Sequence, residues 1–170
     1  VFGDWSSDVC SSDLNALDTL IHILLEGRLR ASGRLVRGRH PVVSLSSRGP
    51  LEFEEFRQWH RSMGRWTVDP YGIAVRRERI RNMGAKPAIY GTDSFYRRLR
   101  PVDFFRFRLA DASGRWRKEH EWRLNGDLWL EDLAFDDFFA FVPCQKDAER
   151  LGSFISEPLQ CVVWNAVASP

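Results

Sequence analysis

The sequence has few cysteines, no long apolar run and no leader-like start. Cys10, Cys144 and Cys161 form an odd set without Cys-x-x-Cys spacing or paired histidines, so we expect neither a disulfide framework nor a metal site. No apolar stretch approaches the ~18 residues that span a membrane. Residues 1–14 also lack the basic start and apolar core of a secretory signal. These absences predict a cytoplasmic protein that does not associate with membranes.

The common enzymatic motifs are absent too. The chain has no P-loop, no Gly-x-Gly-x-x-Gly after a strand, no His-Glu-x-x-His and no Gly-x-Ser-x-Gly. It also has no internal repeat at the spacing of a solenoid. Any catalytic site must therefore be recognised from less specific patterns.

What the chain does contain is typical of one soluble domain. Its 170 residues are 44% apolar and 28% charged, which is too apolar for a disordered chain. Of the 25 basic residues, all but Lys86, Lys118 and Lys146 are arginine. Because the planar guanidinium binds phosphates and carboxylates through two hydrogen bonds, this excess mildly indicates an anionic ligand.

The first residues differ in composition from the rest. Residues 4–14, DWSSDVCSSDL, resemble a sequencing adapter translated in one frame, as occurs in metagenomic fragments. We therefore expect residues 1–14 to be an adapter-derived artefact that lies outside as a poorly packed arm. Residues 15–170 are then the single domain. Since residues 1–14 hold three aspartates and no basic residue, the net charge rises from +2 to +5 without them.

The spacing of apolar residues predicts a mixture of short helices and strands. Leu17 to Leu25 repeat at helical spacing, with Asn15 or Asp18 as the cap and Gly27 as the stop. Further helices are expected at 50–63, 77–83, 92–100 and 145–151, and strands at 42–46, 71–75, 87–90, 102–109, 119–124, 128–130, 138–142 and 161–164. Asn125-Gly126 predicts a hairpin turn. Because no steady βαβ order emerges, we predict a single α+β domain with small mixed and antiparallel sheets.

Residues 118–130, KEHEWRLNGDLWL, carry the most informative pattern. Glu119 and Glu121 are two apart on a strand, so both face one side, whereas Trp122 and Leu124 face the other. One interpretation is a pair of carboxylates salt-bridged to Arg106, Arg108 or Arg123. The other is a catalytic pair, since neighbouring carboxylates raise one another's pKa unless a cation offsets them.

The same segment resembles a known family. Glu-x-Glu, an apolar strand, an Asn-Gly turn and a second apolar strand resemble the catalytic segment of ADP-ribosyltransferases, and VVSLSS at residues 42–47 is similar to their serine-bearing strand. Across residues 17–151, the order of motifs from IL-x-EG-x-x-RAS through PVVSLS, YGIAV and GAKPAIY to E-x-EWR resembles an uncharacterised bacterial family. We associate that family with a compact ADP-ribosyltransferase-like fold, akin to the DNA-modifying toxins of the superfamily.

The resemblance implies specific roles. NAD would be the substrate, Glu121 the catalytic glutamate and Glu119 the residue that orients the acceptor. Ser46 would brace the nicotinamide ribose, Arg28 or Arg30 would clamp the pyrophosphate, and Tyr71 would stack on the nicotinamide. The acceptor, protein or nucleic acid, stays open, as does a toxin–antitoxin or phage-defence role.

Two further expectations come with the resemblance. The superfamily's first strand precedes the helix at Leu17, so the fold is expected to lack it. We expect its absence to leave an unpaired sheet edge or an exposed apolar groove beside Val42 to Ser46, and a fragment without full activity. The alternative function is a non-catalytic module that binds nucleic acid or another partner through the basic loop from Arg28 to Arg39.

Overall fold

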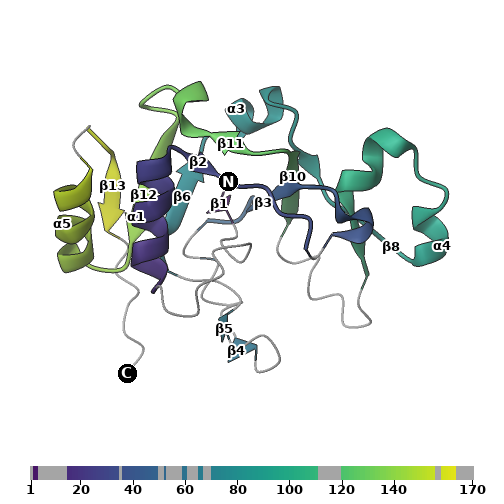
Figure 1. Ribbon diagram of the computed structural model, residues 1–170, viewed down its shortest axis with the longest axis horizontal. Coiled ribbons are helices and arrows are strands. Elements are labelled where there is room, and N and C mark those ends of the chain that lie inside the picture. Colours follow the sequence, from purple (N-terminus) through teal and green to yellow (C-terminus); the bar gives the residue numbers. More distant parts are fainter. Residues whose placement is uncertain are drawn as a thin grey trace.

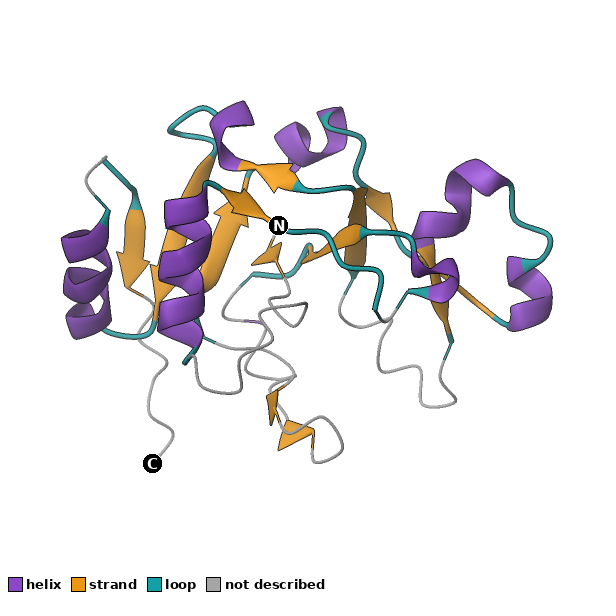
Figure 2. Ribbon diagram, viewed as in Figure 1, coloured by secondary structure: helices purple, strands orange, loops and turns teal. Residues whose placement is uncertain are grey.

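The fold is α+β, as the order of predicted elements indicates (Figure 2). The computed structural model describes residues 2–3, 15–34, 36–49, 52, 59–60, 65–66, 70–110, 120–155 and 158–163. The helices in these ranges are α1 (Ala16–Glu26), α3 (Arg77–Asn82), α4 (Asp93–Tyr96) and α5 (Gln145–Phe154), with the 3-10 helices η1 (Arg37–Arg39), η3 (Pro101–Arg106) and η5 (Leu130–Asp132). None of them has the length and apolar character that crossing a membrane requires.

Seven strands of the described residues form the main sheet, in the order β13-β12-β6-β1-β3-β10-β7. They are β1 (Phe2–Gly3), β3 (Val42–Ser46), β6 (Gly72–Val75), β7 (Lys86–Pro87), β10 (Glu121–Asn125), β12 (Phe138–Val142) and β13 (Cys161–Val163). Neighbours run antiparallel, except that β12 and β13 run parallel and are joined through α5. Smaller pairs join β2 (Arg28–Leu29) to β11 (Leu128–Trp129), β4 (Trp59–His60) to β5 (Arg65–Trp66), and β8 (Ile89–Gly91) to β9 (Phe107–Leu109).

One face of the main sheet packs against α1 and α5 and holds the core (Figure 1). α1 begins and ends as predicted: Asn15 accepts a hydrogen bond from the Asp18 amide, and Gly27 ends the helix with φ +69°. The buried face of α1, with Leu17, Leu20 and Ile21, meets apolar side chains of the sheet and Leu151 of α5. An ion pair between Arg150 and Asp18 (2.7 Å) also joins the two helices.

The N-terminus departs from the expected outside arm. Phe2–Gly3 form β1 inside the main sheet, where Phe2 pairs with Ser46 on one side and with Ala74 on the other. Since β10 flanks β3 on its other side, the expected unpaired edge beside Val42–Ser46 is wrong. Residues 4–14 lie outside the described residues, and the adapter origin of residues 1–14 stays a prediction.

The helix predicted at 50–63 lies mostly on residues that the structure does not describe. Its end is wrong, because Trp59–His60 pair as a strand with Arg65–Trp66. The spacing of apolar residues predicted a helix here, and the pairing of the two short strands overrides that local signal.

The strand predicted at 102–109 is also wrong over most of its length. Residues 101–106 form η3, and only 107–109 pair as β9. Pro101 starts the helix, where its missing amide hydrogen costs nothing. Asp103 then binds Arg100 and Arg106, each three residues away, and a 3-10 helix aligns side chains at that spacing.

The predicted hairpin at Asn125-Gly126 does not form either. Gly126 has the left-handed φ of +88° that such a turn requires, yet β11 pairs with β2 and β10 pairs with β3 and β7. The reason is hydrogen bonding to a distant part of the chain, residues 31–41. The Gly126 amide donates to the Pro41 carbonyl, and the Asp127 carboxylate accepts from the Ala31 amide. These contacts lead the chain away from β10.

Candidate functional site

The β3–β10 pair positions the candidate site. In its register Glu121 stands opposite Ser46, and Arg123 stands opposite Ser44. Val43, Leu45 and Leu124 alternate with these residues and belong to the core. Because successive side chains of a strand point to opposite faces, Glu121, Arg123, Ser44 and Ser46 share the face away from α1 and α5.

Glu121 is buried and fully hydrogen-bonded. Its Oε1 accepts from Arg123 Nε (2.8 Å) and from Ser44 Oγ (3.1 Å), and its Oε2 accepts from Arg108 of β9. The side chains of Glu121 and Arg123 are each 4% exposed, whereas that of Arg108 is 23% exposed. For Glu121, the salt-bridged interpretation is thus confirmed with Arg108 and Arg123, whereas Arg106 binds Asp103 and the Pro87 carbonyl instead.

Arg123 also links the sheet to the segment that carries Arg108. Its NH1 donates to the backbone carbonyls of Phe105 (3.1 Å) and Phe107 (2.6 Å), at the junction of η3 and β9. A guanidinium has five N–H donors in a rigid fork, so one side chain can hold a carboxylate and two carbonyls at once. Arg123 therefore fixes Glu121 and the backbone beside Arg108 in one geometry.

The charges around Glu121 decide its ionisation. Burial by itself raises the pKa of Glu121, but the positive charges of Arg123 and Arg108 and their hydrogen bonds outweigh burial and hold the pKa below its ordinary value. Glu121 is therefore an anion at neutral pH. An anion inside a largely closed site can stabilise positive charge that develops beside it.

The residue before Glu121 has an uncommon backbone. His120 has φ +48°, in the left-handed region that non-glycine residues rarely adopt. Its carbonyl accepts from the Ser47 amide (3.2 Å), which joins the ends of β3 and β10. Backbone strain of this kind often occurs at functional sites. His120 and Ser44 were not among the predicted residues, and the Ser44-x-Ser46 spacing is the signal that could have found Ser44.

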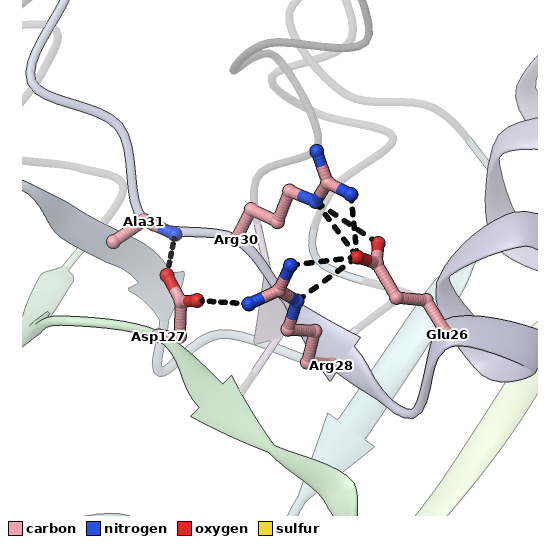
Figure 3. Close-up of polar contacts among 5 residues, drawn as sticks. All are labelled: Glu26, Arg28, Arg30, Ala31 and Asp127. Carbon is pink, nitrogen blue, oxygen red and sulfur yellow. Dashed lines mark hydrogen bonds and ion pairs between the residues drawn. The ribbon is translucent and has the colours of Figure 1, made fainter.

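Arg28 and Arg30 form their ion pairs with carboxylates other than that of Glu121. Figure 3 shows both guanidinium groups directed toward Glu26. Arg28 binds Glu26 and Asp127, at 2.9 and 3.1 Å, and lies over the ring of Trp129. Among the described residues, Glu26 is the ion-pair partner of Arg30. Asp127 lies beyond the Asn125 end of β10, about 13 Å or more along the strand from Glu121 at 3.3 Å per residue.

The other predicted residues are not brought to Glu121 either. Tyr71 packs against the core cluster, and its hydroxyl donates to Asp147 of α5 (3.0 Å). Phe2 pairs with both Ser46 and Ala74, so the side chains of Ser46 and Ala74 lie on the same face of the sheet. Side chains alternate between faces along a strand, and Tyr71 is three residues from Ala74, so Tyr71 lies towards the other face. Glu119 lies outside the described residues. Ser46 is the one predicted partner that the register places across from Glu121.

Comparisons with protein-family models, curated proteins and solved structures give no match to this chain. Within the described ranges, no three histidine, cysteine, aspartate or glutamate residues are grouped as metal ligands. The chemistry of the site therefore rests on Glu121, its two arginines and the serines of β3.

Proposed function

We propose that this protein is an NAD-dependent ADP-ribosyltransferase-like enzyme with Glu121 as its catalytic residue. The observation that carries the proposal is the β3–β10 register, which sets the Ser46 position against an ionised, buried Glu121. A serine-bearing strand beside the glutamate strand is the arrangement that the resemblance implies. The α+β architecture is compatible with it.

The proposed chemistry uses Glu121 electrostatically. When the bond between nicotinamide and ribose breaks, nicotinamide leaves with the bonding electrons and the ribose C1 becomes cationic. As the bond breaks, the positive charge moves from the nicotinamide ring to the ribose. A fixed carboxylate beside C1 therefore stabilises the cationic ribose more than the intact substrate, which is how an enzyme lowers a barrier. The acceptor's nucleophile then bonds to C1 and loses its proton. Glu119 is proposed to orient that nucleophile.

Arg108 is the better candidate for the pyrophosphate of NAD. It is the more exposed of the two arginines on Glu121, so its guanidinium is the one that a phosphate can reach without opening the core. A phosphate that binds Arg108 would also free one oxygen of Glu121 for the ribose. For Arg28 or Arg30 to serve in this way, ion pairs to Glu26 and Asp127 would have to open.

The test is release of nicotinamide from NAD, followed by chromatography. The unaltered chain should release it, and Glu121→Gln should reduce the rate by ~10²–10³. Because Arg123 loses its buried partner in that variant, the assay is run at a temperature where circular dichroism shows both proteins folded. Ser46→Ala, which disturbs no ion pair, should also lower the rate. Equal rates in folded Glu121→Gln and its parent, or no release by the parent, overturn the proposal.

A role in toxin–antitoxin or phage-defence systems is part of the same proposal. It depends entirely on the resemblance and on NAD turnover, since depletion of NAD or modification of a macromolecule would be the harmful act. If nicotinamide is released, expression of the active chain in bacteria should slow growth, and the Glu121→Gln variant should not.

A further inference from the structure

The end of the molecule furthest from α5 is rich in arginine. Two segments form it, residues 34–40 and residues 92–108, which together contain eight arginines, two aspartates and no lysine or glutamate. We call these two segments the arginine lobe. In Figure 1 its helix α4 stands at the opposite end of the molecule from α5. The lobe includes neither Arg28 nor Arg30.

Ring contacts and an ion pair hold the two segments together. His40 of the first segment packs on Phe104 of the second, with ring centroids 6.0 Å apart. Within the second segment, Tyr96 packs on Phe104 at 4.8 Å. Arg37 binds Asp93 at 2.8 Å and lies over the Tyr96 ring. The arginines of both segments are therefore presented from one unit of structure.

The loop that carries Arg34 and Arg39 is tightly closed. A Cβ at Gly33 would stand 2.4 Å from the Arg39 carbonyl oxygen, so only glycine allows this approach. Hydrogen bonds from Val36 to Gly33 and from Arg39 to Val36 complete the turn. Arg39 itself has φ +54°, which a non-glycine residue adopts at a cost. Keeping arginine at a strained position suggests a use for its side chain.

Much of the positive charge in the arginine lobe is not neutralised. Arg34, Arg39, Arg97 and Arg98 are exposed, and none forms an ion pair with any residue that the structure describes. Both aspartates of the lobe are already bound, Asp93 by Arg37 and Asp103 by Arg100 and Arg106. The exposed face is therefore strongly cationic.

An exposed aromatic ring lies among these charges. Phe95 is 38% exposed, and the guanidinium of Arg98 lies 5.9 Å from its ring centroid. A cationic surface with an exposed ring suits a polyanion whose own groups are flat and can stack. Phosphates bind the guanidinium forks, and bases stack on aromatic rings and on arginine planes.

We infer that the arginine lobe binds single-stranded nucleic acid. An acidic protein surface would bind the arginines through charge and would not need the exposed ring of Phe95. In a duplex the bases are stacked inside the helix, so they could not stack on that ring. Arg108, at the end of the lobe, binds Glu121, but the exposed arginines Arg34, Arg97 and Arg98 are not among the described partners of Glu121, so nucleic-acid binding by them does not require NAD turnover. The inference that the lobe binds nucleic acid does not depend on the proposed function.

The first test measures how much the exposed arginines contribute to binding. Fluorescence anisotropy follows the whole chain binding to a labelled 20-nucleotide oligothymidine and, separately, to oligouridine, from 50 to 200 mM salt. A variant with Arg34→Gln, Arg97→Gln and Arg98→Gln should bind at least tenfold more weakly. Its slope of log affinity on log salt should be smaller by about 2, at ~0.7 per phosphate contact. Comparing the two oligonucleotides tells DNA from RNA.

The matched control removes three exposed basic residues elsewhere, in Arg81→Gln, Lys86→Gln and Lys146→Gln. It should keep nearly all of the affinity. Equal losses in both triple variants, or no binding by the parent at 50 mM salt, overturn the inference. Arg39→Gly adds a variant that relieves backbone strain, and circular dichroism checks that it is folded, so that weaker binding by it reports the loss of the side chain.

The second test measures how much stacking of bases on the Phe95 ring contributes to binding. Phe95→Ala should weaken oligothymidine binding by at least about fivefold, because base–ring stacking is lost. It should leave binding to heparin, a polyanion without bases, unchanged. Phe135→Ala, at a ring 50% exposed outside the lobe, is the control and should change neither. If Phe95→Ala has no effect on oligothymidine, or if polyglutamate binds the parent as tightly, nucleic acid is the wrong partner.

Discussion

At the scale of single residues, the arrangement around Glu121 has two effects that pull in different directions. Its ion pairs with Arg108 and Arg123 keep it charged, which catalysis at a cationic ribose needs. The same ion pairs occupy both carboxylate oxygens. An exchange of Arg108 from Glu121 to a substrate phosphate would resolve this conflict, and the greater exposure of Arg108 makes it the residue able to move.

The two arginines should differ in their effect on stability. Arg123→Gln leaves Glu121 buried with one charge partner fewer and leaves the Phe105 and Phe107 carbonyls without that donor, so it should lower the free energy of unfolding by ~3–5 kcal/mol. Arg108→Gln should cost less, because Arg108 is more exposed than Arg123 and water can partly replace its guanidinium. Urea denaturation at pH 7 measures both. Equal costs, or a larger cost for Arg108→Gln, would show that Arg123 is not the structural link.

The lowered pKa of Glu121 predicts how stability depends on pH. A carboxyl whose pKa is lower in the folded than in the unfolded chain contributes stability above its unfolded pKa, ~4.3, and loses that contribution as the pH falls through its folded pKa. The gap in unfolding free energy between the parent and Glu121→Gln should therefore be constant from pH 7 to about 5 and shrink below. Urea titrations at a series of pH values test this. A gap that widens in acid would mean that the sign of the shift is wrong.

At the scale of elements, the closed loop before η1 gives a matched pair of glycines. Gly33→Ala puts a Cβ against the Arg39 carbonyl and should destabilise the protein by ~1–3 kcal/mol while weakening oligonucleotide binding. Gly152→Ala, in α5 with open space around it, should instead stabilise by ~0.5–1 kcal/mol. Thermal and urea unfolding compare the two variants. A Gly33→Ala protein as stable as its parent would contradict the tight approach.

The elements that could be predicted are those whose signals are local. α1 follows from its apolar stripe, Asn15 and Gly27, and the alternation in β10 correctly separates Glu121 from Trp122 and Leu124. The pattern at 102–109 misled, because alternating aromatic and basic residues also suit a 3-10 helix followed by three strand residues. Gly126 has the left-handed φ that an Asn-Gly turn requires, but β11 pairs with β2 and not with β10. That pairing depends on the contact between Arg28 and Asp127, and no local pattern contains this contact.

The candidate site was predicted only in part, for the same reason. Glu121 and Ser46 could be paired through the resemblance, and Arg108 and Arg123 through charge. The separation of Arg28 and Arg30 from Glu121 could not be predicted, because it depends on which end of β10 lies beside the segment that carries the two arginines. Their partner Glu26 lies two residues before Arg28 and four before Arg30, and this closeness in sequence was the signal for the two ion pairs.

At the scale of the whole molecule, the core and the candidate site lie on opposite faces of the main sheet. Its helix-covered face holds the core, and its other face holds Glu121, Arg123 and the serines of β3. The segment that follows α4 connects this face to the arginine lobe, since η3 belongs to the lobe and leads directly into β9, which brings Arg108 to Glu121. A nucleic acid on the lobe would thus lie beside the proposed NAD site, where it would be placed as an acceptor.

Binding of NAD at Glu121 is the central claim, and nuclear magnetic resonance of the 15N-labelled chain tests it most directly. On titration with NAD, the backbone amides of Ser46, Arg108 and Glu121 should shift together and saturate. The same titration of Arg108→Gln should need a higher NAD concentration, while the spectrum otherwise remains that of a folded protein. Shifts confined to Arg28 and Arg30, or a spectrum that NAD leaves unchanged, would contradict the assignment of the site.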